Sequence, residues 1–402
     1  MTSRRSVLLG LGAFALAAGG TARLALASAP VDQRLVVIVL RGAMDGLGAA
    51  PPYSDPDYRG MRGALAIAEP GAVDGALDLD GRFGLHPRLA TLKALYDRKQ
   101  LILAHAVATS YRDRSHFDGQ DLLENGTIVP HGAADGWLNR TLSLLRGDER
   151  SGIALGDQVP LILRGDVEVA SWAPTKLPGA DGDFVTRVEQ MYQASPMLLA
   201  ALESAVAADR MAAEALGSDQ GTMAGGGDYR HGGAAVLAEA AGRFLAEPDG
   251  PRIAVLEING WDTHAGQGAA DGRLARALGE LDGAVDALHR SLGAAWDRVV
   301  VLTATEFGRT AAPNGTGGTD HGTASCAFLM GGAIEGGRAL ADWPGLDRSR
   351  LYQGRDLAPT MDLRALAKGV LQDHLGLPAD ALARVVFPGS DRVGPLRDLV
   401  RI

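Results

Sequence analysis

Five short apolar runs constrain the fold of this chain more than any other feature. They lie at 35–40, 101–107, 253–258, 299–303 and 326–330. Their residues are apolar almost throughout rather than in alternation, a pattern typical of strands that are covered on both faces. The runs therefore predict a sheet enclosed between two layers of helices.

Helical patterns lie between these runs. One places Leu274, Leu278, Leu281, Val285, Leu288 and Leu292 on a single face, and another begins at Pro87. The alternation predicts an α/β fold with a doubly wound, mostly parallel sheet flanked by helices. We expect a single domain over residues 28–402, with a helical insertion at about 165–250, where the alternation breaks.

The amino-terminal segment has the features of an export signal. Arg4 and Arg5 precede an apolar run that reaches about Leu26, and Ala25-Leu-Ala27 supplies a cleavage pattern. Arg23 interrupts the run and disfavours a stable membrane anchor. Residues 1–27 therefore predict a twin-arginine signal peptide, recognition by the twin-arginine translocation machinery, and a periplasmic or secreted protein.

Charge and cysteine usage narrow the possible functions. Without residues 1–27 the chain keeps 36 basic and 48 acidic residues, a net charge of about −12. Such a chain is poorly suited to bind nucleic acid, which requires clustered lysine and arginine. Cys326 is the only cysteine, so an intramolecular disulfide and an iron–sulfur cluster are both disfavoured. Its apolar neighbours predict a buried thiol.

Acidic and histidine side chains follow or precede the predicted strands. They are Asp45, Asp262, His264, Glu306, Asp320 and His321. Strand ends bring distant parts of an α/β chain into one crevice, where such side chains can bind a metal ion. Asp262 and His264 are two residues apart and face one side of an extended segment. The pattern predicts a divalent metal ion and leaves zinc, manganese, calcium and magnesium open.

Four of these positions also have a structural interpretation. Asp45 fits an Asp-Gly turn, Asp262 and His264 fit a hydrogen-bonded pair, and Glu306 with Arg309 fits an ordinary ion pair. Arg309 alternatively offers a planar donor fork for a phosphate, sulfate or carboxylate group.

Ser115 and His116 follow the second apolar run and open a predicted helix. Ser115 fits an N-cap, and the amides at that position also favour an anion. It is therefore a candidate nucleophile for a phosphate or sulfate ester as well as a plain cap. His116 is compatible with a ligand, a general acid or a loop histidine.

Six segments together resemble a known family. They are Leu40-Arg-Gly-Ala-Met-Asp-Gly46, Ser115-His-Phe-Asp-Gly-Gln-Asp121, Gly260-Trp-Asp-Thr-His264, Thr305-Glu-Phe-Gly-Arg309, Thr319-Asp-His-Gly322 and Asp362-Leu-Arg364. With the twin arginines they resemble the exported bacterial proteins called domain of unknown function 1501. That family is in turn similar to the alkaline phosphatase and sulfatase superfamily.

The resemblance implies an alkaline-phosphatase-like fold with one or two divalent metal ions. It implies that Asp45, Asp262, His264 and His321 are ligands and that Ser115 is the nucleophile. Phe307 stands where the phosphatases usually have a histidine, so that one metal site is incomplete unless Asp320 or His116 contributes.

We therefore expect an exported, metal-dependent hydrolase of phosphate or sulfate esters, in which Ser115 or a metal-bound water attacks the ester. Its substrate would be an anionic small molecule or a glycan ester. The alternative, favoured by Phe307, is a non-catalytic binding or assembly protein that retains the fold.

Overall fold

In the part of the chain that the structure describes, the main sheet has nine strands. The computed structural model describes residues 32–145, 152–174, 182–199, 202–203, 206 and 233–401. The strands of the sheet are β1 (Arg34–Leu40), β4 (Leu101–Ala108), β5 (Gly152–Leu155), β6 (Ala170–Trp172), β7 (Ile253–Ile258), β8 (Val299–Ala304), β9 (Ser325–Met330), β10 (Arg338–Leu340) and β11 (Met361–Asp362). A separate antiparallel pair joins β2 (Leu77–Asp78) to β3 (Gly84–Leu85). All five predicted apolar runs are strands of the main sheet.

The strand order is β10-β4-β9-β8-β1-β7-β5-β6, with β11 paired to β4. Strand β1 lies between β7 and β8 and is parallel to both. Strand β9 is antiparallel to β4 and to β8, whereas the other pairs of this sheet are parallel. The predicted doubly wound, mostly parallel α/β sheet is confirmed.

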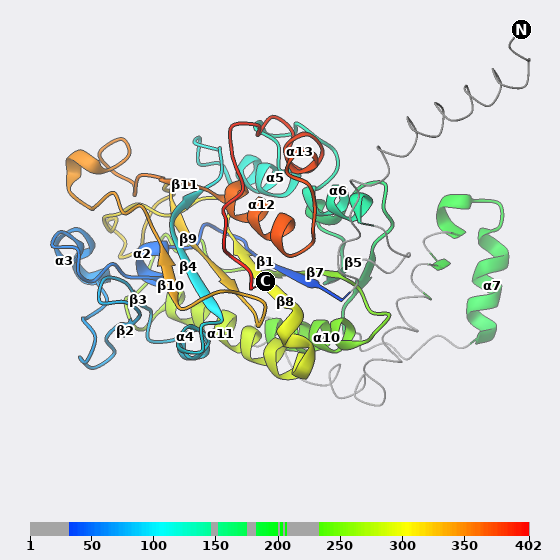
Figure 1. Ribbon diagram of the computed structural model, residues 1–402, viewed down its shortest axis with the longest axis horizontal. Coiled ribbons are helices and arrows are strands. Elements are labelled where there is room, and N and C mark those ends of the chain that lie inside the picture. The colour runs from blue at the N-terminus through cyan, green and yellow to red at the C-terminus, as the bar shows by residue number, and fades with distance from the viewer. Residues whose placement is uncertain are drawn as a thin grey trace, which may run out of the picture.

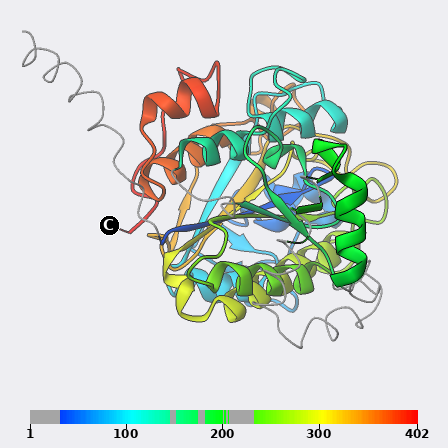
Figure 2. The same ribbon diagram turned by 90° about the vertical axis from the view of Figure 1, so that its right-hand side faces the viewer.

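Helices cover both faces of the sheet (Figures 1 and 2). Val36 and Ile38 of β1 enter one hydrophobic core, while Val37 and Val39 enter the other. Because successive side chains of a strand point to opposite faces, a continuous apolar strand supplies both cores at once. Each such buried side chain contributes about 1.5–3 kcal/mol relative to exposure.

The first core includes side chains of α4 (Ala90–Asp97), α10 (Gly233–Ala246) and α11 (Arg273–Leu292). The second includes side chains of α6 (Trp137–Leu144) and α12 (Leu363–Asp373). The other α-helices in the described residues are α2 (Gly46–Ala49), α3 (Tyr58–Arg62), α5 (His116–Asn125), α7 (Gly182–Tyr192) and α13 (Ala379–Ala381). In the described part of the chain, no helix combines the length and apolar character needed to cross a membrane.

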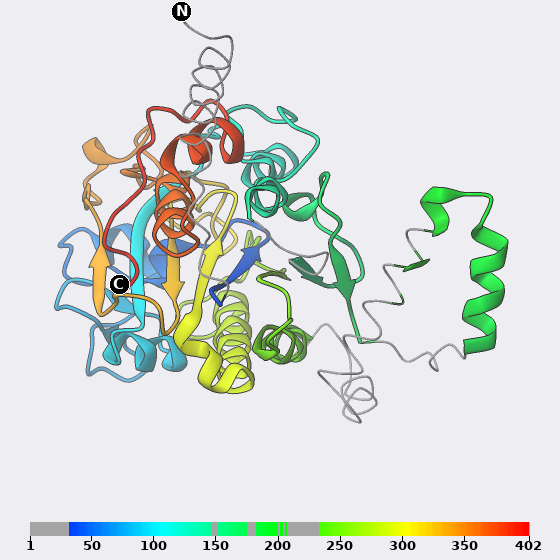
Figure 3. The same ribbon diagram turned by 45° about the vertical axis from the view of Figure 1, so that its right-hand side comes forward.

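The region predicted as a helical insertion contributes directly to the sheet and its helical layer. Strand β6 extends the sheet beside β5. Helix α10 packs along α11 and against β7, and Figure 3 shows the two helices side by side beneath the sheet. The boundaries of an insertion and the single-domain assignment remain predictions, and the signal segment 1–27 lies outside the described residues.

The segments that carry the predicted site residues lie at one edge of the sheet. Strands β1, β4, β7 and β8 end there, since β1 is parallel to β7 and β8 while β9 is antiparallel to β4 and β8. Strand β9 therefore begins at the edge where its neighbours end. The segment between β8 and β9, which carries Glu306, Arg309 and His321, lies entirely along this edge.

Candidate metal centre

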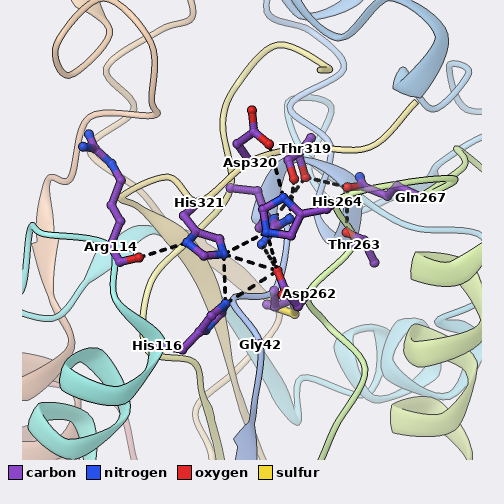
Figure 4. A network of polar contacts seen from close by, with 12 residues as sticks. Gly42, Arg114, His116, Asp262, Thr263, His264, Gln267, Thr319, Asp320 and His321 are labelled. Carbon is purple, nitrogen blue, oxygen red and sulfur yellow. Dashed lines mark hydrogen bonds and ion pairs between the residues drawn. The ribbon is translucent and has the colours of Figure 1, made fainter. Parts of the chain in front are cut away.

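Three side chains from separate segments point their ligand atoms at one another. They are His116 at the first position of α5, Asp262 after β7 and His321 before β9. Nε2 of His116 lies 3.0 Å from Nε2 of His321. Asp262 Oδ1 lies 3.5 Å from the first nitrogen and 3.4 Å from the second. Figure 4 shows this triangle.

His264 stands beside the triangle. Its Nε2 is 2.9 Å from Nε2 of His321 and 3.0 Å from Asp262 Oδ1. About 45% of its side chain is exposed, against 26% for His321 and 23% for His116. The group therefore has an open side, and His264 contributes a fourth donor atom next to two of the others.

The opposite nitrogen of each imidazole is held by an oxygen acceptor. His116 Nδ1 lies 2.7 Å from Glu306 Oε1, and His264 Nδ1 lies 3.2 Å from Asp320 Oδ1. His321 Nδ1 lies 2.9 Å from the carbonyl oxygen of Arg114. A carbonyl or carboxylate oxygen only accepts, so each Nδ1 donates. In a neutral ring the Nε2 atom then carries the lone pair. Those of His116 and His321 belong to the triangle, and that of His264 lies beside it.

Lone pairs about 3 Å apart require a positive charge between them. In proteins, zinc binds nitrogen and oxygen at about 2.0–2.1 Å, so two corners of its tetrahedron are about 3.3–3.4 Å apart. The triangle has edges of 3.0, 3.4 and 3.5 Å. It matches one face of such a tetrahedron, and its Nδ1 acceptors match the carboxylate and carbonyl partners of metal-bound histidines.

The donor set favours some metals over others. Imidazole nitrogens suit zinc and the neighbouring transition metals, whereas calcium and magnesium prefer oxygen ligands. A set of imidazoles beside one carboxylate therefore fits zinc or iron better than manganese, calcium or magnesium.

Without a metal, a proton on His116 relieves the repulsion between the rings. The hydrogen bond to Glu306 raises the pKa of His116 above its usual value, although burial opposes this effect. Burial lowers the pKa of His321, and the nearby positive charges of His116 and Arg309 lower it further. Protonation is thus favoured at His116 over His321.

Glu306 is completely buried behind His116. Its Oε1 also accepts from the Gly42 amide at 2.9 Å and from Gln120 Nε2 at 3.1 Å. Burial alone raises the pKa of a carboxyl group, but these hydrogen bonds outweigh it and hold the pKa of Glu306 below its ordinary value. Glu306, predicted as a metal ligand, therefore lies behind a ligand candidate and orients its ring.

Arg309 orients the carboxylate of Asp262, as Glu306 orients the ring of His116. Its Nη1 donates to Asp262 Oδ1 at 2.6 Å, while Nε and Nη2 donate to the side chain and carbonyl of Thr319. Burial raises the pKa of Asp262, but the contact with Arg309 outweighs burial and lowers it. Because the Arg309 side chain is fully buried, its guanidinium is directed at the protein and not at the open side.

The other predicted residues, Asp320, Asp45, Ser115 and His116, lie in four different places. Asp320 contacts Nδ1 of His264 and not the triangle. Asp45 pairs with Arg62 in the protein interior. Ser115 is the N-cap residue of α5, as predicted, but its hydroxyl makes no capping hydrogen bond and lies beside the hydroxyl of Tyr111. His116, predicted among the catalytic residues, belongs to the triangle.

Sequence reasoning missed the supporting residues Arg62, Gln120 and Gln267. Gln120 and Gln267 both contact carboxylates of the predicted site residues. Gln120 lies in one of the segments that resembled the family, and this was its only signal. Arg62 and Gln267 carry no local pattern, because their partners are distant in the chain.

The family model for DUF1501, "Protein of unknown function", matches residues 98–386. The chain belongs to this family. The resemblance inferred from the six segments is therefore confirmed for the family. No functionally curated protein is similar enough in sequence to be matched to this DUF1501 protein.

Several solved structures are similar over most of the chain. The C-terminal periplasmic domain of EcEptC from Escherichia coli has a TM-score of 0.40 at 10% identity, covering 91% of this chain and 88% of the other. The same domain in complex with Zn has a TM-score of 0.37 at 9% identity, with coverages of 90% and 87%. Phosphonate monoester hydrolase of Agrobacterium radiobacter has a TM-score of 0.34 at 11% identity, with coverages of 86% and 74%.

Proposed function

We propose that this DUF1501 protein is an exported, metal-dependent hydrolase of phosphate or sulfate esters. The observation that carries the proposal is the convergence of two imidazole nitrogens and one carboxylate oxygen at the sheet edge, with a third imidazole beside them and each opposite Nδ1 directed to an acceptor. That arrangement orients lone pairs toward a cation and leaves one side open to solvent.

In this proposal His116, Asp262 and His321 hold the metal, and His264 is the fourth donor. A bound divalent ion would polarise the ester and stabilise the negative charge that develops during its cleavage. Glu306, Asp320 and the Arg114 carbonyl keep the three imidazoles turned toward the ion. Arg309 holds the Asp262 carboxylate and would act as a positioning residue, which replaces its predicted role as the group that binds the substrate anion.

Ser115 is the proposed nucleophile. It immediately precedes His116, and its hydroxyl is not used to cap α5. The first-turn amides of a helix favour an anion, so the same helix end would help to hold the ester group. Attack by the Ser115 oxygen, which gives up its proton to solvent, would form a bond to phosphorus or sulfur while the bond to the leaving alcohol breaks and that oxygen takes up a proton. Attack by water would then transfer the group from Ser115 to water and restore the hydroxyl.

Export by the twin-arginine pathway and a periplasmic or secreted location are part of this proposal. They rest on the amino-terminal sequence. The negative net charge of the mature chain would repel an anionic small-molecule or glycan ester. The proposed metal ion would offset this repulsion at the site.

The decisive experiment measures metal content and ester hydrolysis together. Wild type, Asp262→Ala and Ser115→Ala would be exported by their own signal, purified without chelator and analysed for bound metals. We expect stoichiometric metal in wild type and Ser115→Ala and its loss in Asp262→Ala. Asp271→Ala, at an exposed ion pair with Arg88, is the matched control. A panel of aryl phosphate and sulfate esters then tests turnover with the metal that is found.

Equal metal content in wild type and Asp262→Ala would refute the site. A folded wild-type protein that neither contains nor takes up metal would instead support a non-catalytic binding protein. The structure offers one observation in favour of that alternative. The guanidinium groups of Arg309 and Arg355 donate to Asp262 and to the carbonyl of His321, and that of Arg114 donates to Asp356, so all three are already used by protein acceptors.

A further inference from the structure

Asp45 has no acceptor position left for a metal ion. Its Oδ1 accepts from the amides of Leu47 and Gly48 at 3.1 and 3.2 Å. Its Oδ2 accepts from Gln267 Nε2 at 2.5 Å and from Arg62 Nη2. An ionised carboxylate has about four lone-pair sites. Donors from the protein therefore occupy all of them.

The partner of Asp45 is a permanently charged group. The side chains of Arg62 and Asp45 are 0% and 1% exposed. Arg62 Nη1 donates to the carbonyl oxygens of Thr310 and Ala311 at 3.3 and 3.1 Å. A metal that displaced Arg62 from Asp45 would leave a buried guanidinium without its counter-ion, which is strongly unfavourable.

A chain of hydrogen bonds connects this ion pair to the metal centre. The donor and acceptor atoms available determine which group donates in each hydrogen bond. Arg309 can only donate, so the Thr319 hydroxyl accepts from its Nε at 3.1 Å and donates its own proton to Gln267 Oε1 at 2.6 Å. Thr263 donates to the same oxygen at 2.8 Å. The amide nitrogen of Gln267 must then face Asp45.

The chain continues from Arg309 to Oδ1 of Asp262, the carboxylate oxygen of the triangle. Figure 4 shows the part that runs through Gln267, Thr263 and Thr319. Gln267, Thr263 and Thr319 are fully buried. Each member is thus held by two neighbours in one orientation, and water does not compete for these hydrogen bonds.

We infer that the centre is mononuclear and that Arg62 supplies, at Asp45, the positive charge that a second ion supplies in two-metal sites. The inference rests on the proposed function, because it concerns the metal of that same site. It corrects the prediction that Asp45 is a ligand. It also makes Gln267 a positioning residue, because the hydrogen bonds of Gln267 connect the Asp45–Arg62 ion pair, through Thr319 and Arg309, to Asp262.

Metal counting and X-ray absorption test the inference on the intact protein. Chelator-treated wild type would be titrated with zinc, dialysed and analysed for zinc per chain. We expect one equivalent and a spectrum with nitrogen and oxygen neighbours. Two equivalents, or a metal neighbour at about 3.5–4 Å, would overturn the inference.

Asp45→Asn provides the second test, with Asp271→Asn as its surface control. We expect one equivalent of zinc in both variants. Loss of the zinc in folded Asp45→Asn would show that Asp45 is a ligand and overturn the inference. If this variant does not fold, the absorption spectrum of wild type still decides between one ion and two.

The outcomes also separate this inference from the hydrolase proposal. A wild-type protein that takes up no zinc or other divalent ion would remove both. One equivalent without hydrolysis of any ester would remove the hydrolase and leave the single-ion centre. Two equivalents with hydrolysis would leave the hydrolase and remove only the single-ion centre.

Discussion

Replacement of Glu306 by glutamine tests whether a buried charge strengthens metal binding through His116. Glu306 Oε1 accepts from His116, Gly42 and Gln120, and Oε2 contacts the Thr305 hydroxyl at 3.0 Å. Glutamine has the same shape. Its carbonyl oxygen can accept from the same three donors while its amide group faces Thr305. The substitution therefore removes a charge and little else.

We expect Glu306→Gln to weaken metal binding strongly and to change the stability of the fold little. A hydrogen bond to an ionised acceptor is roughly twice as strong as one to a neutral acceptor. Loss of the partner of a metal-bound imidazole typically weakens metal binding by about 10–100-fold. That range corresponds to about 1.4–2.7 kcal/mol. Glu306→Ala should also destabilise the fold, because it leaves the buried Gly42 amide unpaired at about 1–3 kcal/mol.

The assay is a competition titration of zinc between the protein and a metallochromic chelator at one fixed pH, with thermal melts of the metal-free forms. Asp271→Asn removes an exposed carboxylate and should bind zinc as wild type does. A dissociation constant for Glu306→Gln within twofold of wild type, with an unchanged melt, would refute the reasoning.

Three further substitutions probe other contacts. Gln267→Leu removes the hydrogen bonds that link Asp45 to Thr319. We expect the zinc affinity to fall by about 10-fold in the same titration. Tighter zinc binding would contradict a positioning role for this chain of hydrogen bonds. His264→Ala leaves His116, Asp262 and His321 in place, so one zinc per chain should remain with a weaker affinity, and complete loss in elemental analysis would make His264 indispensable. His374 is buried, donates from Nε2 to the Arg34 carbonyl at 2.8 Å, and burial lowers its pKa to about 4 from 6.5. Because the unfolded chain binds this proton first, the stability that depends on neutral His374 is complete above pH 6.5 and is lost as the pH falls toward 4. His374→Gln keeps a donor for Arg34, and urea unfolding between pH 6.5 and 4 should show a slope smaller by up to about 1.4 kcal/mol per pH unit; equal slopes would exclude His374 as the responsible group.

The strands were predictable because their pattern leaves little choice. Runs such as 253–258 and 299–303 are so uniformly apolar that only a position covered on both faces buries them. The long helix α11 was equally clear, since its leucines recur at three- and four-residue steps. Strands β5, β6, β10 and β11 were missed, because each has at most four residues and no period that distinguishes it from a loop.

For the candidate site, the sequence by itself predicted which segments meet at the edge of the sheet. Polar residues at the ends of apolar strands must meet at a sheet edge, and His116, Asp262 and His321 do so. It could not determine which of these side chains faces the centre. Glu306 and Asp262 both follow buried strands. Glu306 nevertheless contacts Nδ1 of His116, whereas Asp262 lies beside Nε2 of His116 and His321.

Only the tertiary structure decided these roles, because they depend on partners that strand order and loop paths bring together. Asp45 was indistinguishable from a ligand until the structure placed the buried guanidinium of Arg62 against it. The orientation of Gln267 likewise follows from Thr319 and Arg309, which lie in the segment between β8 and β9. Periodicity records which face of an element is buried. It contains no information on which donor meets which acceptor across the fold.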